Sequence, residues 1–293
     1  MNPTRSAFVV LFSWFVASSA IAQDRPTIVT VNYPLQFFAE RLVGDAADVV
    51  FPVPQDVDPS FWRPAIADIS AIQSADLILL NGAGFATWID RVSLPRSKVV
   101  NTTANIEDQF IRTESITHAH GEGEEHSHEG TASYVWLDPM LAIAQAEAVA
   151  SAIIARDIAP ADAVNDQLNE LRSDLKELDA ESRAAIDGLQ NITIIATHPR
   201  YQYLARAYGL SISSLEWEAG AMPTQAEIAD LEAVVEQTGA EVIFWERQPP
   251  DAAFEITRDL GLHNAVFSPL AHQVDGQSYL DTLRAAFTGF PKD

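Results

Sequence analysis

The chain has 293 residues, of which 41 are acidic and 18 are Lys or Arg, and its formal net charge at pH 7 is −23. A charge of this size repels nucleic acid and anionic membrane surfaces, so no nucleic-acid partner is expected. The absence of cysteine excludes disulfides and thiolate metal sites. The hydrophobic content of 47% is sufficient for the cores of one large or two ordinary domains.

Residues 1–22 have the pattern of a cleaved secretory signal peptide. Arg5 supplies the positive charge, residues 7–16 form an apolar run, and residues 20–22 form a small-residue cleavage site. The apolar run is too short to span a membrane. No cysteine follows it to carry a lipid. We therefore expect an exported protein without a lipid anchor, most simply in a Gram-negative periplasm.

Strands and helices alternate in the first part of the mature chain, which we assign to an N-terminal lobe at 23–158. Strands are predicted at 27–32, 48–53, 77–81 and 98–101, and helices at 35–43, 64–75, 85–92 and 140–154. This βα alternation is typical of a largely parallel sheet covered by helices.

A polar segment, residues 106–132, interrupts this alternation. Its central part, 118–129, holds four of the seven histidines, namely His118, His120, His126 and His128. They form two H-x-H pairs, and each pair can bind a metal ion because alternate side chains of an extended chain share a side. Ordering such a loop costs entropy, so its affinity should be modest. An acidic loop with incidental histidines is the alternative interpretation. His263 and His272 are expected in surface loops.

A long helix is predicted at 163–186, inside a linking segment at 159–188. Its apolar residues recur mostly every three or four positions and form one stripe: Val164, Leu168, Leu171, Leu175, Leu178 and Ile186. A helix of roughly 25 residues is about 37 Å long, enough to run along a whole lobe.

The alternation then resumes in a C-terminal lobe at 189–293. Strands are predicted at 192–196, 210–215, 241–245 and 265–267, and helices at 199–208, 225–238, 252–260 and 277–287. The predicted fold is therefore α/β, with two lobes. Each lobe is a largely parallel sheet flanked by helices, and one long helix joins them.

Three possible metal ligands follow strands of the second lobe. His198 follows the β-branched strand 192–196, Glu218 follows the next strand, and Glu246 ends an apolar strand. Because parallel strands end at the same edge of a sheet, these side chains could converge on one ion. Zinc accepts such nitrogen and oxygen ligands at roughly 2.0–2.2 Å.

Each of these residues also has a structural interpretation. His198 could be a structural residue of a turn that leads into a helix beginning at Pro199. Glu218 could be a solvated loop charge. Glu246 could form an ion pair with Arg200 or Arg247, because burying an unpaired carboxylate is costly.

Four segments resemble the zinc- and manganese-type solute-binding proteins of ABC transporters. They are ADLILLNGAGFATWID at 75–90, YVWLDP at 134–139, ATHPRYQYLARAYGL at 196–210 and DGQSYLDTLR at 275–284. The resemblance covers nearly all of the mature chain, and a His-rich loop is typical of the zinc members. It implies a two-lobed clamp that binds one divalent cation between its lobes and delivers it to a membrane permease.

The resemblance carries over only one of the usual ligands. The family places histidines at the positions of Ser60, Tyr134 and His198 and a carboxylate near Ser268, and only His198 matches. Either the protein binds little metal at this place, or it builds the site from other residues. Those residues would be Glu246, Glu218 or a histidine of the loop.

The sequence therefore predicts the periplasmic substrate-binding component of a divalent-metal ABC transporter, with zinc as the first choice of metal. Its partners would be the permease and ATPase of the inner membrane, and the protein itself is expected to be a monomer. The alternative is a periplasmic zinc buffer or metallochaperone that acts through the His-rich loop. The same ligands also suit Mn²⁺, Fe²⁺ and Cu²⁺. No enzyme is expected, because the hydrolase and nucleotide-binding motifs are absent from the sequence.

Overall fold

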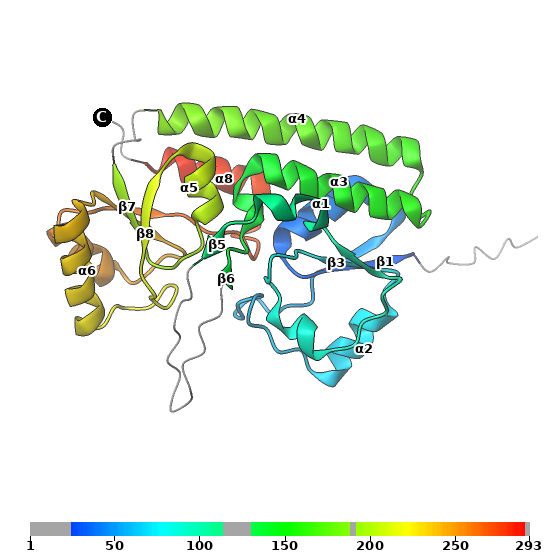
Figure 1. Cartoon of the computed structure of the whole chain (residues 1–293), viewed down its shortest axis with the longest axis horizontal. Helices are drawn as coiled ribbons and strands as arrows, with labels where there is room; N and C mark the ends of the chain where they lie inside the picture. The colour runs from blue at the N-terminus through cyan, green and yellow to red at the C-terminus, as the bar shows by residue number, and fades with distance from the viewer. Residues whose placement is uncertain (1–24, 114–129, 188–191, 291–293) are drawn as a thin grey trace, which may run out of the picture.

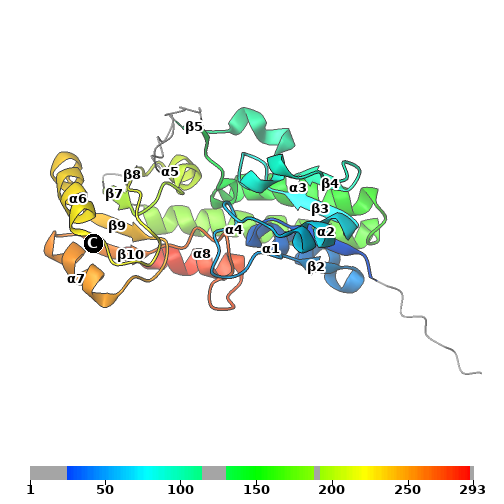
Figure 2. The same cartoon turned by 90° about the horizontal axis from the view of Figure 1, so that it is seen from below.

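A computed structural model describes residues 25–113, 130–187 and 192–290. Two sheets lie at opposite ends of the molecule, and one long helix runs along both of them (Figures 1 and 2). The signal peptide predicted at 1–22 and the histidines of segment 118–129 lie outside the described residues.

The first sheet has four parallel strands in the order β2-β1-β3-β4. They are β1 (Thr27–Thr30), β2 (Asp48–Val50), β3 (Leu77–Leu80) and β4 (Val99–Asn101). The central strands are buried on both faces, as the fully buried Ile28 and Ile78 show. The helices of this lobe are α1 (Tyr33–Val43), α2 (Ile66–Ser74) and α3 (Pro139–Ala155). Short 3₁₀ turns lie at Gly44–Ala46, Thr87–Arg91, Ala104–Gln109 and Val135–Leu137.

The second sheet also has four parallel strands, in the order β10-β9-β7-β8. They are β7 (Thr193–Ala196), β8 (Ser211–Ser214), β9 (Val242–Trp245) and β10 (His263–Val266). The helices of this lobe are α5 (Gln202–Tyr208), α6 (Gln225–Thr238), α7 (Asp251–Asp259) and α8 (Tyr279–Thr288). The eight predicted strands thus form two separate sheets, which confirms the two-lobed α/β fold. The exact limits of the lobes stay a prediction.

The connecting helix is α4 (Ala161–Ile186). Its predicted apolar stripe is buried, from Val164 to Ile186. It packs on α1 and α3 of the first lobe and on α8 of the second, so it holds both lobes along its length (Figure 2). One continuous apolar core also includes residues of both lobes, such as Ile28 and Phe244.

Residues 268–278, which join β10 to α8, contact the first lobe. Trp136 of the first lobe donates a hydrogen bond from Nε1 to the Pro269 carbonyl at 2.8 Å. The backbone nitrogen of Tyr33 donates to the Ala271 carbonyl at 3.0 Å. These bonds attach the segment between β10 and α8 to the first lobe.

Two local predictions need correction. Helix α5 begins at Gln202 and not at Pro199, because the Arg200 nitrogen closes a tight turn onto the His198 carbonyl at 2.9 Å. His263 is exposed on strand β10, and only His272 lies in a loop, where it is half-buried.

A short antiparallel pair appears within the segment that the sequence indicates is a polar loop. It consists of β5 (Arg112–Thr113) and β6 (Gly130–Thr131) and brackets residues 114–129. The Tyr203 hydroxyl of α5 donates a hydrogen bond to the Ala132 carbonyl at 3.0 Å. This pair is therefore attached to the second lobe.

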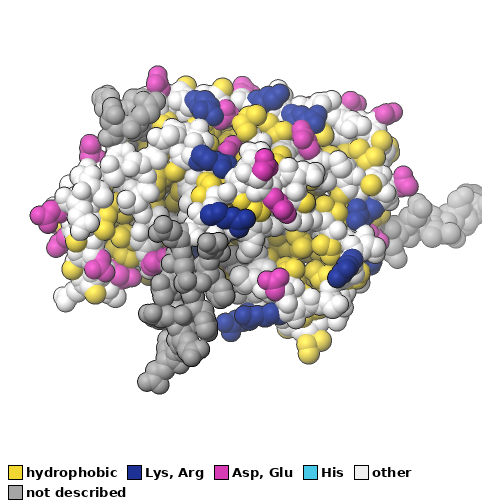
Figure 3. Space-filling view, viewed as in Figure 1, with side chains coloured by type: hydrophobic (Ala, Val, Ile, Leu, Met, Phe, Trp, Pro, Cys, Tyr) yellow, Lys and Arg dark blue, Asp and Glu magenta, His cyan; other side chains and the backbone are white. Residues whose placement is uncertain are grey.

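Surface charge is unevenly distributed on the face shown in Figure 3. The end of the molecule formed by α6 shows acidic side chains, whereas the basic ones lie over the middle and the first lobe. Helix α6 itself carries Glu227, Asp230, Glu232 and Glu236 and no basic residue. Helix α6 thus adds four negative charges at this end of the molecule.

Candidate site between the lobes

Arg200 lies at the centre of the contact between the lobes, just beyond strand β7. Its Nη2 donates to Asp58 Oδ2 of the first lobe at 2.6 Å, and its Nε donates to Glu246 Oε1 at 3.1 Å. The Arg200 and Glu246 side chains are each 10% exposed, and that of Asp58 is 34% exposed. The guanidinium therefore joins carboxylates of both lobes. We refer to Asp58, Tyr134, His198, Arg200 and Glu246 as the inter-lobe site.

Aromatic rings surround the same guanidinium. Its central carbon lies 4.7 Å from the ring centroid of Tyr134 and 5.9 Å from that of Phe61. Such contacts stabilise a cation at a ring face. Tyr134 is buried, and burial raises the pKa of its phenol above the ordinary value, although the charge of Arg200 lowers it. Tyr134 is therefore a neutral phenol, which is a poor metal ligand.

The other two positions where the family resemblance implies ligands also carry hydroxyl groups. The Ser60 hydroxyl donates to Asp58 Oδ1 at 2.5 Å, and its backbone nitrogen donates to the same oxygen at 2.8 Å. The Ser268 hydroxyl accepts a bond from the Leu270 nitrogen at 3.2 Å. Both hydroxyls are used to shape their own loops.

The His198 ring is oriented by a hydrogen bond to the backbone of the loop that follows β8. Its Nδ1 lies 3.1 Å from the Trp217 carbonyl oxygen. Since a carbonyl can only accept, Nδ1 carries the hydrogen of the neutral ring and Nε2 keeps a lone pair. Within the described ranges, no hydrogen-bond partner of Nε2 is found. Metal-binding histidines commonly have this arrangement, in which the second nitrogen donates to a carbonyl.

The two predicted carboxylate ligands differ in their exposure to solvent and in their partners. Glu218 follows Trp217 directly and is exposed. Glu246 is paired with Arg200, which is the structural alternative that the sequence left open. In the part of the chain that is described, no group of three or more His, Cys, Asp or Glu side chains is arranged to hold a metal ion. This conformation does not assemble His198, Glu218 and Glu246 into a ready-made site.

Sequence reasoning missed the contribution of Asp58. It considered Arg200 only as a partner of Glu246, and the second partner lies 142 residues away in the chain. The only available signal was that Asp58 belongs to the segment where the family resemblance implies a ligand.

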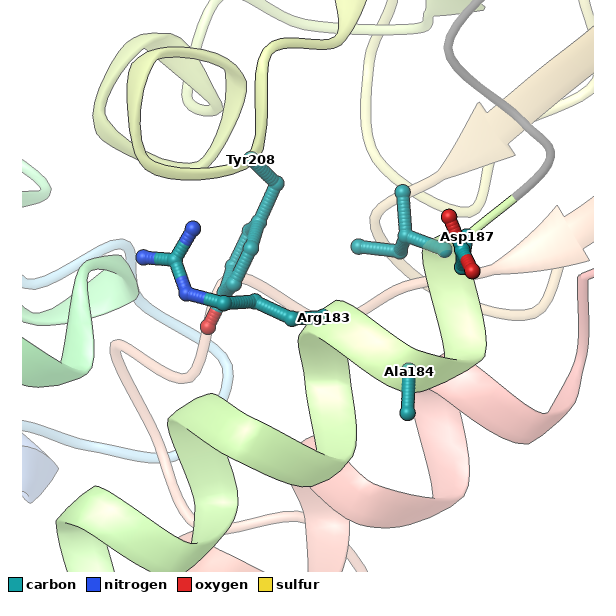
Figure 4. Close-up of a pocket in the computed structure, with 5 residues that line it drawn as sticks. Arg183, Ala184, Asp187 and Tyr208 are labelled. Carbon is teal, nitrogen blue, oxygen red and sulfur yellow. The ribbon is translucent and has the colours of Figure 1, made fainter.

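Two pockets elsewhere in the described structure do not offer a metal site. One, of about 390 Å³, lies at the end of α4 and contains a single carboxylate, that of Asp187 (Figure 4). Arg183 lies over the Tyr208 ring there, at 5.3 Å from its centroid. The other, of about 410 Å³, lies beside Trp62 and Trp88 of the first lobe and contains no His, Asp or Glu.

Two lobes, each a parallel sheet flanked by helices, are joined by one long helix and have polar side chains between them. This arrangement is that of a clamp-type solute-binding protein. Residues 28–290 match the family model described as "ZnuA: Zinc-uptake complex component A periplasmic". The chain belongs to this family, which confirms the resemblance seen in the sequence. Its members are uptake components, and this confirms that the chain is not an enzyme.

Two relatives are similar along most of this chain. It is 28% identical to the high-affinity zinc uptake system protein ZnuA of Bacillus subtilis, over 89% of this chain and 85% of the relative. It is 27% identical to the zinc-binding protein AdcA of Streptococcus pyogenes, over 95% of this chain. The alignment covers 58% of the length of AdcA.

Solved structures support the fold. The metal-dependent lipoprotein YcdH from Bacillus subtilis superposes with a TM-score of 0.74 at 23% identity, covering 90% of this chain and 97% of the other. The Zn(II)-bound ZnuA-like domain of AdcA from Streptococcus pneumoniae gives a TM-score of 0.74 at 20% identity, with the same coverage. Among the described helices, none is both long and apolar enough to cross a membrane. Because YcdH is called a lipoprotein, the expected lack of a lipid anchor stays a prediction.

Proposed function

We propose that this protein is the zinc-binding component of an ABC uptake system and delivers the ion to a membrane permease and its ATPase. The observation that carries this proposal is the family match over residues 28–290, together with the clamp fold. The relatives are named for zinc binding and zinc uptake. The predicted signal peptide would place the protein in the periplasm, where such a component collects its cargo.

His198 is the first proposed zinc ligand. Its tautomer leaves Nε2 free to bind, and imidazole nitrogen is a preferred zinc ligand. Glu246 and Glu218 are the proposed carboxylate ligands. Glu246 accepts a bond from Arg200 through Oε1, so a zinc ion that binds this carboxylate has to share it with the guanidinium or displace the guanidinium from it. The same donors also suit Mn²⁺, Fe²⁺ and Cu²⁺.

The loop histidines, His118, His120, His126 and His128, are proposed to gather zinc and raise its concentration near the lobes. This role rests on the two H-x-H pairs in the sequence. A buffer that acts through this loop alone would not need the inter-lobe site or a permease. The relatives favour the uptake role, because they are named as zinc-uptake or zinc-binding proteins.

A growth experiment tests the uptake role. A strain that lacks this protein should grow poorly when a chelator limits zinc, and added zinc should restore growth where manganese and iron do not. The full chain should rescue the strain, whereas His198→Ala should not. Loss of the permease should give the same defect, and loss of both should be no worse. Additive defects would instead indicate a separate buffer.

A further inference from the structure

A positive charge of the chain itself lies at the inter-lobe site. The Arg200 guanidinium contacts one carboxylate from each lobe, Asp58 at 2.6 Å and Glu246 at 3.1 Å. Its side chain is only 10% exposed, so solvent screens its charge poorly. The chain thus supplies its own cation where the two lobes meet.

This cation lies close to the proposed metal ligand. The Arg200 nitrogen is bonded to the His198 carbonyl at 2.9 Å, so both residues belong to one tight turn. The proposed ligand Glu246 is the carboxylate to which Arg200 donates through Nε. A metal ion bound here would be repelled by the guanidinium and would compete with it for the negative charge of Glu246.

From this geometry we propose that Arg200 is a tethered cation that competes with the divalent metal for Glu246 and so sets the affinity of the inter-lobe site. This inference rests on the proposed function, because it assumes that a metal ion enters between the lobes. Zinc then binds Glu246 at the expense of the ion pair between this carboxylate and the guanidinium. Arg200 weakens zinc binding, although it is one of the residues that hold the lobes together.

The sign of the effect distinguishes this role from simple packing. Removing a structural arginine would leave zinc affinity unchanged or weaken it, because the site would lose shape. Removing a competing cation tightens binding, because it releases the Glu246 carboxylate and removes a repulsive charge. A lysine at the same position keeps the charge and should keep most of the competition.

The test measures zinc dissociation constants for the full chain, stripped of metal, in competition with a chromophoric chelator. Arg200→Met should bind zinc at least about tenfold more tightly than the parent. Arg200→Lys should stay within about threefold of the parent. Arg206→Met is the matched control. Arg206 also bridges the lobes, donating to the Gln109 carbonyl at 2.6 Å and lying over Tyr203, but among the described residues it forms no ion pair with Glu246.

A second pair of variants assigns the gain to the inter-lobe site. Adding His198→Ala to Arg200→Met should abolish the gain, whereas weak binding by other histidines should persist. If Arg200→Met does not fold, the double variant Asp58→Asn with Arg200→Gln replaces it in the test. The double variant also removes the Asp58 carboxylate, which the loss of Arg200 would leave without its ion-pair partner. That double variant should bind zinc more tightly than Asp58→Asn alone.

The outcomes separate this inference from the proposed function. Tight zinc binding by the parent that does not improve in Arg200→Met overturns the inference and leaves the function standing. Binding that appears only in Arg200→Met supports the inference and contradicts zinc capture by the parent. A gain in Arg206→Met equal to that in Arg200→Met also overturns the inference, because the effect would not depend on Glu246. If neither the parent nor Arg200→Met binds zinc, both ideas fail.

Discussion

The Arg200 guanidinium and the Glu246 carboxylate form an ion pair of 3.1 Å in which both side chains are 10% exposed. Breaking a pair of this kind leaves a charge in a poorly solvated place, so the pair is expected to matter for stability. Glu246 is also a proposed zinc ligand. The stability of the metal-free protein and its affinity for metal therefore depend on the same carboxylate.

The first prediction concerns Glu246→Gln, which keeps the shape of the side chain and removes its charge. Considered alone, the sequence predicts little effect on folding, whereas the ion pair predicts a loss of about 2–4 kcal/mol in the free energy of unfolding. Denaturant unfolding of the metal-free protein measures this loss. Glu218→Gln, at an exposed position, is the control and should cost less than about 0.5 kcal/mol. Equal costs would show that the buried pair contributes nothing.

The second prediction separates packing from ligation at Tyr134. Because burial keeps its phenol neutral, Tyr134→Phe should leave zinc affinity within about twofold of the parent. Tyr134→Ala should cost about 3–5 kcal/mol of stability, because it removes a ring packed against Trp136 and Phe85. Loss of zinc binding in Tyr134→Phe would mean that the hydroxyl is a ligand.

The third prediction is a pH dependence that arises at His272. Burial lowers the pKa of this imidazole, although its hydrogen bond with the Val57 carbonyl at 2.7 Å raises it. The unfolded chain therefore takes up this proton first as the pH falls through the ordinary value of about 6.5. The resulting stability is present above that pH and is lost as the pH falls toward the lowered pKa.

His272→Gln keeps a donor for the Val57 carbonyl and removes the titration. Its free energy of unfolding should therefore fall less steeply than that of the parent between about pH 7 and 5. His263→Gln, at an exposed position, controls for the loss of one imidazole. Parallel slopes in the parent and His272→Gln would contradict the prediction.

The fourth prediction concerns segment 118–129. Its replacement by a Gly/Ser segment of equal length should lower the number of zinc ions bound and leave the thermal stability of the metal-free protein unchanged. The segment has almost no apolar side chains to pack, since Ala119 is its only one. Equal length keeps the β5–β6 pair closed by a loop of the same span. A marked fall in melting temperature would show that the segment is structural.

Most of the fold could be predicted from local patterns. The apolar stripe of α4 and the run Ile192–Ile195 marked a long helix and a buried strand. The limits of α6 were predicted correctly, because Thr224 forms a capping box with Glu227 and Gly239 ends the helix in the left-handed conformation. The β5–β6 pair could not be predicted, because strands of two residues carry no periodic signal.

The candidate site could be predicted only in part. Because parallel strands end at the same edge of a sheet, the sequence correctly placed His198 and Glu246 beyond the carboxyl ends of neighbouring strands, β7 and β9. It could not show that Glu246 binds Arg200 or that Asp58 joins them, because side-chain partners across lobes depend on tertiary packing. Whether these residues ligate zinc stays a prediction.

The most direct test of the central claim, that His198 binds zinc between the lobes, is a zinc titration of the metal-stripped full chain. The account predicts one tight site in the parent protein that disappears in His198→Ala and persists in His263→Ala, with the weaker binding of the loop unchanged. A tight site that survives in His198→Ala with its one-to-one stoichiometry would contradict the account.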